Sequence, residues 1–312
     1  MHFPFIRSFF ISIRGNFLVL PSLCLLSSCQ APNTHHDPLA EMSLEPKILG
    51  QGIISTSEFH ESINTISRTK DTLYFSRADK GFEQSTLLVS SFVDGKWDTP
   101  DTLPFSGDYY DAGLDFSPDQ TIAFFTSKRA PNKKGLSKAW NIWKVQLKSH
   151  SWGKPEVLEF PINSDSLECC FTMNEQGEAY FASNRSGSWD IYYTKYTGQS
   201  FEKITKVSNI INTLAGEWPS YIDRTGNLLI FSSIRKEGLG GDDLYLSRKN
   251  ARTWSELRLL AAPINSPSYE DSPLLTEDGQ VLLFSSWRET SFSKGVSNIY
   301  FAKWFLGAEH ED

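Results

Sequence analysis

Short apolar runs that end in phenylalanine recur along the chain at nearly equal spacing. Each run is followed by Ser, Thr or Ala, and the runs end at Phe75, Phe125, Phe181, Phe231 and Phe284. A spacing of roughly 50 residues is typical of a repeat fold, in which one supersecondary unit is copied along the chain. The pattern therefore predicts five repeats.

Each repeat contains the pattern of four short strands. In the third repeat a first strand ends at the turn MNEQG, and AYFAS, DIYYT and ITKVS follow as the second, third and fourth strands. The second strands are apolar on both faces, which is typical of a sheet that is packed on each side. Four-stranded sheets repeated around an axis form a β-propeller. The sequence therefore predicts an all-β fold, a five-bladed β-propeller of four-stranded antiparallel blades.

The two ends of the repeat region complement each other. The fifth repeat stops at NIYFAKWF without a fourth strand, and the segment EPKILGQGII before the first repeat has no partner of its own. We predict that residues 46–54 form the outer strand of the last blade, because closing the ring removes an exposed sheet edge. The predicted propeller domain spans residues 46–312.

Three phrases connect these repeats with a known family. FSPDQ, SNRSGSWDIY and SSWRETSFSKGVSNIY resemble the TolB-type β-propeller repeat, a WD-like repeat, and the resemblance covers Glu45 to the C-terminus. Relatives of this type include TolB, propeller domains attached to peptidoglycan-binding domains, polysaccharide lyases and oligopeptidases. The resemblance implies the propeller fold and a bacterial envelope protein, and it is weak for function.

The first residues have the pattern of a secretory signal. Arg7 and Arg14 precede an apolar run at 17–26, and two serines and Cys29 follow. The run is well below the roughly 20 residues that a membrane-spanning helix requires. This order of charge, apolar run, small residues and Cys resembles the lipobox of bacterial lipoproteins.

We therefore predict a lipoprotein signal peptide at residues 1–28, lipidation of Cys29 and a flexible tether at residues 29–45. An ordinary signal peptide that is cleaved nearby is the alternative. The lipid anchor predicts a position on the bacterial outer membrane, periplasmic or surface-exposed, with membrane contact through the anchor only.

Charge and cysteine usage restrict the partners. The chain has 37 acidic and 30 basic residues and a formal net charge of −7, which disfavours nucleic-acid binding because phosphate recognition needs a basic face. Beyond Cys29 only the adjacent Cys169 and Cys170 remain. Neighbours on a strand point to opposite faces, so we expect two small buried apolar residues, with a vicinal disulfide or a metal pair as the alternative.

Charged residues recur at fixed places in the repeats. A carboxylate begins each first strand, an arginine follows each second strand, and Asp or Asn opens most third strands. The predicted ring comprises Glu61, Asp111, Glu168, Glu217, Glu270, Arg129, Arg185, Arg235, Arg288, Asp190 and Asp243. Structural residues recur whereas catalytic residues occur once, so we interpret this ring as ion pairs and hydrogen bonds that register the blades.

Residues that break the symmetry are the candidates for binding. The loop between Arg129 and Asn141 is long, and the candidate binding residues near the charged face are Lys133, Lys134, Lys138, Trp140, Trp189, Trp218 and Trp287. Propellers commonly bind through such loops and the mouth of the channel. Packing between blades is the alternative for the tryptophans.

Enzyme signatures are poor. The histidines lack metal-ligand spacing, and the sequence contains no G-x-S-x-G elbow and no phosphate loop. Asp115 is a weak candidate for a catalytic carboxylate because the equivalent residues of the other repeats are uncharged; a buried Asp bonded to backbone amides is the alternative.

The sequence predicts no cofactor and no metal site. Our leading hypothesis is a non-catalytic envelope module that binds an envelope protein or a glycan. The alternative is a carbohydrate-active enzyme, a glycosidase or lyase, that uses carboxylates at the channel mouth.

Overall fold

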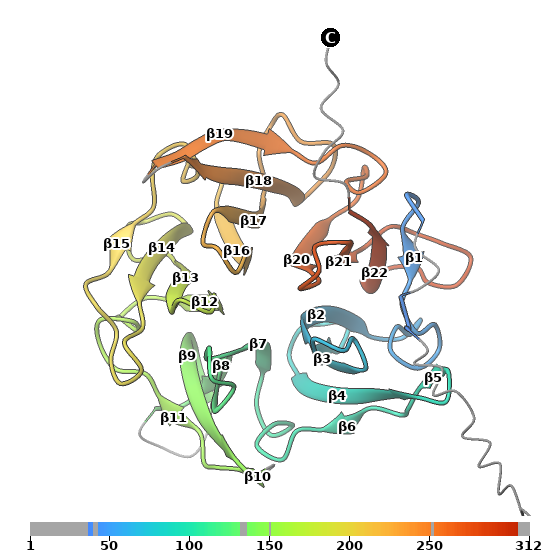
Figure 1. The fold of residues 1–312 in the computed structure, drawn as a ribbon, viewed down its shortest axis with the longest axis horizontal. Helices are drawn as coiled ribbons and strands as arrows, with labels where there is room; N and C mark the ends of the chain where they lie inside the picture. Colours follow the sequence, from blue (N-terminus) through green and yellow to red (C-terminus); the bar gives the residue numbers. More distant parts are fainter. Residues whose placement is uncertain (1–36, 40–42, 132–135, 150, 251–252, 305–312) are drawn as a thin grey trace, which may run out of the picture. The chain divides into compact units, whose positions relative to one another are not determined.

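Five antiparallel sheets surround a central axis. The structure, a computed structural model, describes residues 37–39, 43–131, 136–149, 151–250 and 253–304. These residues belong to one compact unit, His36–Asp312, and the described elements are all strands (Figure 1). The predicted five-bladed propeller is confirmed.

Each blade runs outward from the axis in the order of its strands. The blades are β2 (His60–Ile66), β3 (Thr72–Ala78), β4 (Ser85–Val93) and β6 (Asp101–Thr102); β7 (Asp111–Phe116), β8 (Ile122–Arg129), β9 (Leu136–Lys148) and β11 (Glu156–Val157); β12 (Glu168–Met173), β13 (Glu178–Ser183), β14 (Asp190–Lys195) and β15 (Thr205–Lys206); β16 (Glu217–Ile222), β17 (Leu228–Ser233), β18 (Asp243–Asn250) and β19 (Thr253–Leu259); and β20 (Glu270–Leu275), β21 (Val281–Ser286), β22 (Asn298–Lys303) and β1 (Lys47–Ile48). Two further short strands, β5 (Lys96–Trp97) and β10 (Ser151–Trp152), extend β4 and β9 as hairpins.

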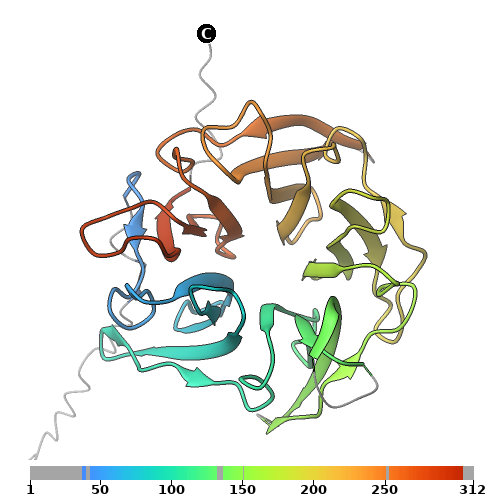
Figure 2. The ribbon, with the colours of Figure 1, turned by 180° about the vertical axis from the view of Figure 1, so that it is seen from behind.

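The N-terminal strand closes the ring, as predicted. Lys47 and Ile48 of β1 pair with Phe301 and Tyr300 of β22, and the two strands lie side by side in both views (Figure 1, Figure 2). The strand is shorter than the predicted 46–54, because the chain turns at Gly50, where φ is +54°. Residues 50–55 then lead into the first blade.

The predicted tether of residues 29–45 needs a correction at its C-terminal end. Leu39 is fully buried in the core cluster that contains Leu49 and Ile54, and Asp37 forms an ion pair with Lys70 at 3.2 Å. The physical reason is the burial of apolar surface, which stabilises the folded chain even when a single leucine lies in a polar segment. Cys29, the signal segment and the tether residues before Asp37 lie outside the described residues.

The hydrophobic core lies in layers between neighbouring blades. The second strands β17 and β21 are buried at every position. Leu228 and Ile230 of β17 pack with Leu282 and Phe284 of β21, which explains why the second strands are apolar on both faces. Burial between blades therefore leaves the inner strands free to present polar side chains to the axis.

Candidate functional site

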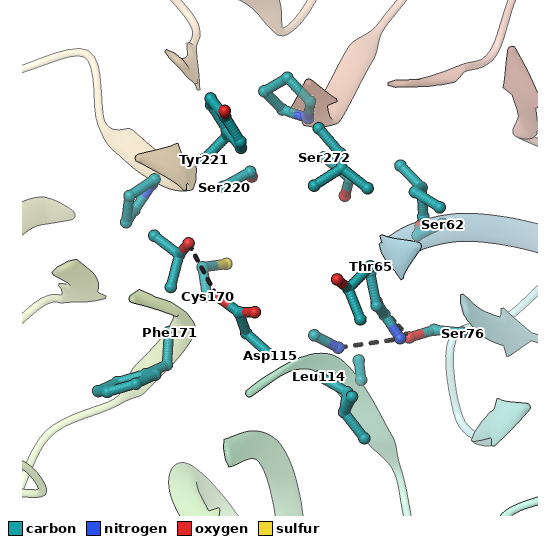
Figure 3. Close-up of a pocket in the computed structure, with 18 of the residues that line it drawn as sticks. Ser62, Thr65, Ser76, Leu114, Asp115, Cys170, Phe171, Ser220, Tyr221 and Ser272 are labelled. Atoms are coloured by element: carbon teal, nitrogen blue, oxygen red, sulfur yellow. Dashed lines mark hydrogen bonds between the residues drawn. The ribbon is translucent and has the colours of Figure 1, made fainter. Parts of the chain in front are cut away.

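A cavity of about 610 Å³ follows the propeller axis and is lined by residues of all five inner strands, β2, β7, β12, β16 and β20. Its wall carries small polar side chains from different blades, among them Ser62, Ser76, Ser220 and Ser272 (Figure 3). A volume of this size lies within the range of small-molecule sites, roughly 300–1,000 Å³. The central channel is therefore the candidate site.

Every inner strand has a β-bulge, which the sequence reasoning missed. The register against the second strand shifts within each of β2, β7, β12, β16 and β20. In three blades the bulged residue has a positive φ, at Gly113, Cys170 and Ser272. A bulge redirects side chains, so the simple alternation expected of a strand fails along the channel wall.

Four alternating charges encircle one end of the channel. They occupy the second position of the turn between first and second strands, and Arg68 and Arg224 each contact both Glu175 and Glu277. The Nε of Arg68 lies 2.9 Å from Glu277, and Nη2 of Arg224 lies 2.9 Å from Glu175. These side chains constrict that end with partly exposed ion pairs.

Aromatic side chains surround the opposite end in two arcs. In the first arc Tyr110 stacks on Trp140 at 6.0 Å between ring centroids, and the contacts continue from Trp140 to Trp189 and from Trp189 to Trp218, each at 6.2 Å. Lys128 Nζ lies 4.4 Å from the centre of the Tyr110 ring. The four rings are partly exposed.

The second aromatic arc comes from the first and last blades. His60 lies 4.3 Å from both Phe82 and Trp287, and Tyr269 lies 5.8 Å from Trp287, measured between ring centroids. Burial lowers the pKa of His60, since desolvation disfavours the imidazolium, and its Nδ1 accepts a hydrogen bond from Ser297 N at 3.0 Å. The four predicted tryptophans thus fall into the two arcs.

The recurring carboxylates are buried and paired with the recurring arginines. Glu61, Asp111, Glu168, Glu217 and Glu270 are each 0% exposed, and their partners are Arg77, Arg129, Arg185, Arg235 and Arg288 at 2.8–3.3 Å. Arg185 also donates to the carbonyls of Pro161 and Ile162, in the linker that enters its blade. Each pair therefore ties a blade to the chain that leads into it.

Asp190 and Asp243 open the third strands of their blades, and among the described residues their ion-pair and hydrogen-bond partners are not the arginines of the predicted ring. Asp190 is fully buried and pairs with Lys206 at 2.8 Å. Asp243 accepts hydrogen bonds from Leu239 N and Gly240 N. Burial raises the pKa of Asp243.

Three asparagines repeat as well, and the sequence reasoning missed them. The Oδ1 of Asn163, Asn212 and Asn265 accepts a hydrogen bond from the backbone of the third strand 21 residues earlier, at Ile142, Ile191 and Leu244. The recurring phrases PIN, IIN and PIN carried this signal. Their role is to fasten the third strand to the linker that leaves the blade.

Asp115 lines the channel, and its carboxylate bridges two blades (Figure 3). Oδ2 accepts hydrogen bonds from Thr172 Oγ1 at 3.0 Å and Met173 N at 2.9 Å, and Oδ1 accepts from Phe116 N at 2.8 Å. Burial raises the pKa of Asp115 to about 6 in spite of these bonds. Oδ2 therefore joins β7 to β12, whereas Oδ1 accepts a hydrogen bond from within β7.

A second pair of non-repeated carboxylates, Asp242 and Asp271, lies between the fourth and fifth blades. Burial raises the pKa of Asp242 to about 7 and that of Asp271 to about 6, and the charge of Asp271 adds to the effect on Asp242. Within the described chain, Oδ1 of Asp242 is buried without a hydrogen-bond partner.

Backbone hydrogen bonds show where this acidic pair lies. Glu270 N donates to Asp242 O at 2.7 Å, just as Glu217 N donates to Trp189 O at 3.1 Å at the preceding blade junction. Asp242 and Asp271 are therefore the counterparts of Trp189 and Trp218, and they lie at the aromatic end. The signal was present in the sequence, because Asp242 is the only acidic residue directly before a third strand and Asp271 the only one directly after a recurring carboxylate.

Two glycines, Gly240 and Gly241, allow the fourth and fifth blades to pack closely together near the acidic pair. A Cβ on Gly240 would lie 2.2 Å from Ser268 O, and a Cβ on Gly241 would lie 2.2 Å from the ring of Tyr269. Glycine at both positions therefore lets the loop before β18 pack on the linker before β20.

The remaining predicted site residues divide as follows. Lys133 and Lys134 lie outside the described residues, and Lys138 lies in β9. Among the described residues, no group of three or more His, Cys, Asp or Glu side chains could hold a metal ion, and no helix is long and apolar enough to cross a membrane.

The two cysteines differ from the expectation that they point to opposite faces. Their Sγ atoms are 3.3 Å apart, and both residues line the cavity. The bulge at Cys170, with φ +56°, is the physical reason, because it ends the alternation of side chains at that point.

Comparisons with known proteins give similarity in fold. No protein-family model and no curated protein sequence matches the chain. Among solved structures it is similar to TolB from Acinetobacter baumannii, with 13% identity, a TM-score of 0.45, and coverage of 79% of this chain and 55% of that chain. This chain thus spans about half the length of that TolB.

Two glycosidases have similar structures. The alpha-L-arabinofuranosidase from Lactobacillus brevis shows 11% identity and a TM-score of 0.49, with 82% of this chain and 93% of that chain covered. The NanB sialidase from Streptococcus pneumoniae shows 12% identity and a TM-score of 0.39, with 71% and 36% covered. The solved structures thus include TolB, which the repeats resemble, and the function must be argued from the site.

Proposed function

We propose that this propeller is a non-catalytic binding module of the bacterial envelope and that its ligand is a glycan, bound at the aromatic end of the channel. The observation that carries the proposal is the arc of Tyr110, Trp140, Trp189 and Trp218, whose partly exposed rings follow one another around the mouth. The apolar faces of sugar rings pack on aromatic rings, which bury a large area at low entropic cost.

The polar groups at the same end suit the hydroxyl groups of a sugar. Asp242 and Asp271 lie at the blade junction that follows Trp189 and Trp218 at the same end, and the serines of the wall offer donors and acceptors deeper in the channel. Small-molecule sites combine an aromatic lining with a few placed polar groups in this way. The acidic net charge of the chain also favours a ligand that is not a polyanion.

One observation supports the alternative function, a glycosidase or lyase. Asp242 and Asp271 are non-repeated carboxylates with raised pKa values, and raised pKa values are common in catalytic acids. In contrast, both oxygens of Asp115 already accept hydrogen bonds, and Oδ2 joins β7 to β12, so we assign Asp115 to the fold.

The proposed location follows from the N-terminal sequence. Lipidation of Cys29 would hold the propeller at the outer membrane of the bacterium. Replacing Cys29 by Ser should abolish palmitate incorporation and membrane partitioning; a variant that stays processed and membrane-bound would contradict the anchor.

The binding proposal is tested by titration calorimetry with oligosaccharides selected from a glycan array. We expect Trp189→Ala to weaken binding at least about tenfold, as expected for a central aromatic contact, with an unchanged melting curve. Trp254→Phe is the matched control, because Trp254 is buried in the core between blades.

Two results would count against the proposal. Equal affinities of the Trp189→Ala variant and the wild type would place the glycan elsewhere. Cleavage of the bound glycan, abolished in Asp242→Asn and Asp271→Asn, would replace the binding module by the enzyme.

A further inference from the structure

We propose that Cys169 and Cys170 form a redox-active dithiol in the channel wall, which a small disulfide compound oxidises to an intramolecular disulfide. The carrying observation is geometric: the two Sγ atoms are 3.3 Å apart, and Cys170 Sγ points toward Cys169 Sγ within hydrogen-bond distance. This inference does not depend on the identity of the channel ligand.

The bulge in β12 is what makes the pair possible. Consecutive side chains of a regular strand point to opposite faces, but the register shifts between Cys169 and Thr172, and Cys170 adopts φ +56°. The equivalent positions in the second and fifth blades hold Gly113 and Ser272, also with positive φ. Positive φ is uncommon for a residue with a side chain. A cysteine at this position therefore costs conformational energy, and packing alone does not account for it.

The two thiols differ in access. Cys169 is 3% exposed, whereas Cys170 is half-buried and faces the cavity beside Asp115 (Figure 3). The hydrogen bond with Cys170 and burial raise the pKa of the Cys169 thiol well above its ordinary value. Cys170 is therefore the sulfur that meets a reagent from the channel, and Cys169 is the resolving thiol.

The reaction balances with a disulfide R–S–S–R as the oxidant. The Cys170 thiolate attacks one sulfur, the S–S bond of the reagent breaks, and one RS⁻ leaves as RSH after taking a proton. Cys169 then loses its proton and attacks Cys170 Sγ, so that the Cys169–Cys170 bond forms and the second RSH leaves. Two thiols are oxidised, one external disulfide is reduced, and the two sulfurs need to approach by roughly 1.3 Å to reach bonding distance.

Treatment of the native protein with glutathione disulfide tests the proposal, read out by mass spectrometry of the tryptic peptide that contains both cysteines. Cys24 and Cys29 lie in a different peptide. We expect the wild-type peptide to lose two hydrogens without keeping a glutathione adduct, and dithiothreitol to restore it. Cys169→Ala should keep one stable adduct on Cys170, because no resolving thiol is present.

Cys170→Gly is the matched variant, since glycine accepts the positive φ of this position. It should fold and leave Cys169 without an adduct, because that thiol is buried. A stable adduct on the wild-type peptide, or no reaction of the native wild type at a concentration that oxidises the peptide after unfolding, would overturn the proposal. The wild-type result decides even if Cys169→Ala does not fold.

Discussion

One buried ion pair in each blade joins the blade to the chain that enters it. Glu217 accepts hydrogen bonds from Thr213 N at 2.9 Å and from Arg235 at 3.2 Å, and both charged side chains are at most 6% exposed. A buried pair of this kind adds less stability than its Coulomb energy suggests, since both ions lose hydration. Removing one of the two charges is nevertheless costly, because the other charge then remains buried without a partner.

We predict that Glu217→Gln lowers the free energy of unfolding by about 2–4 kcal/mol, because Arg235 loses its counter-charge. Urea denaturation measures the change. Glu175→Gln is the control with the same chemistry, since Glu175 pairs with Arg224 at the surface and exposed pairs contribute about 0–1 kcal/mol. Equal losses in the two variants would contradict a structural role specific to the buried ring.

The acidic pair at the channel mouth makes a pH prediction. Asp242 has a folded pKa of about 7, above the ordinary value of 3.8. Between these pH values the folded protein binds more protons than the unfolded one, so the contribution of Asp242 to stability falls as pH rises toward 7. Asp242→Asn removes this charge and should stabilise the protein by about 1–3 kcal/mol near pH 8, after allowance for partial solvent screening.

The gain from Asp242→Asn should disappear near pH 4, where Asp242 is largely protonated. Melting temperatures of the variant and the wild type across this pH range provide the measurement. A constant difference between the two curves would show that hydrogen bonding or packing, and not the charge, explains the effect.

At the residue scale the sequence distinguishes repeated from unique side chains, and this distinction found Asp115. The same comparison of equivalent positions could have found Asp242 and Asp271. It could not reveal that Cys169 and Cys170 share one side, because a bulge depends on tertiary packing and breaks the alternation on which strand reasoning rests.

The closing strand is the element on which the integrity of the ring depends. β1 supplies the outer edge of the last blade, and Leu49 N adds a hydrogen bond of 2.8 Å to Ile299 O. The sequence could predict this pairing because the end of the chain lacked a strand that its start possessed. It could not predict that Leu39 is buried, since an isolated leucine in a polar segment carries no periodicity.

Truncations separate the contributions of these two segments. Deleting residues 30–36 should leave the melting temperature nearly unchanged. Deleting residues 30–44 should destabilise the protein by about 1.5–3 kcal/mol through the lost burial of Leu39, and deleting residues 30–54 should destabilise it most, because the edge of β22 loses its partner. Differential scanning calorimetry measures the series, and identical melting temperatures for the first and last deletions would contradict ring closure by β1.

On the scale of the whole molecule, the propeller has a channel with two different ends. Alternating charges of Arg68, Glu175, Arg224 and Glu277 constrict one end, and aromatic arcs surround the other. The period of the sequence was sufficient to predict the fold, because each blade repeats the same burial pattern. The site was only partly predictable, because its residues come from all five blades at positions where the repeats differ.

The proposed glycan site at the aromatic end is the central claim, and a crystal structure of the protein with its tightest-binding oligosaccharide tests it most directly. We expect electron density for a sugar ring packed against Trp189 or Trp218, with hydroxyl groups directed to Asp242 and Asp271. Density for the sugar only at the charged end or on the outer strands of the blades would contradict the account.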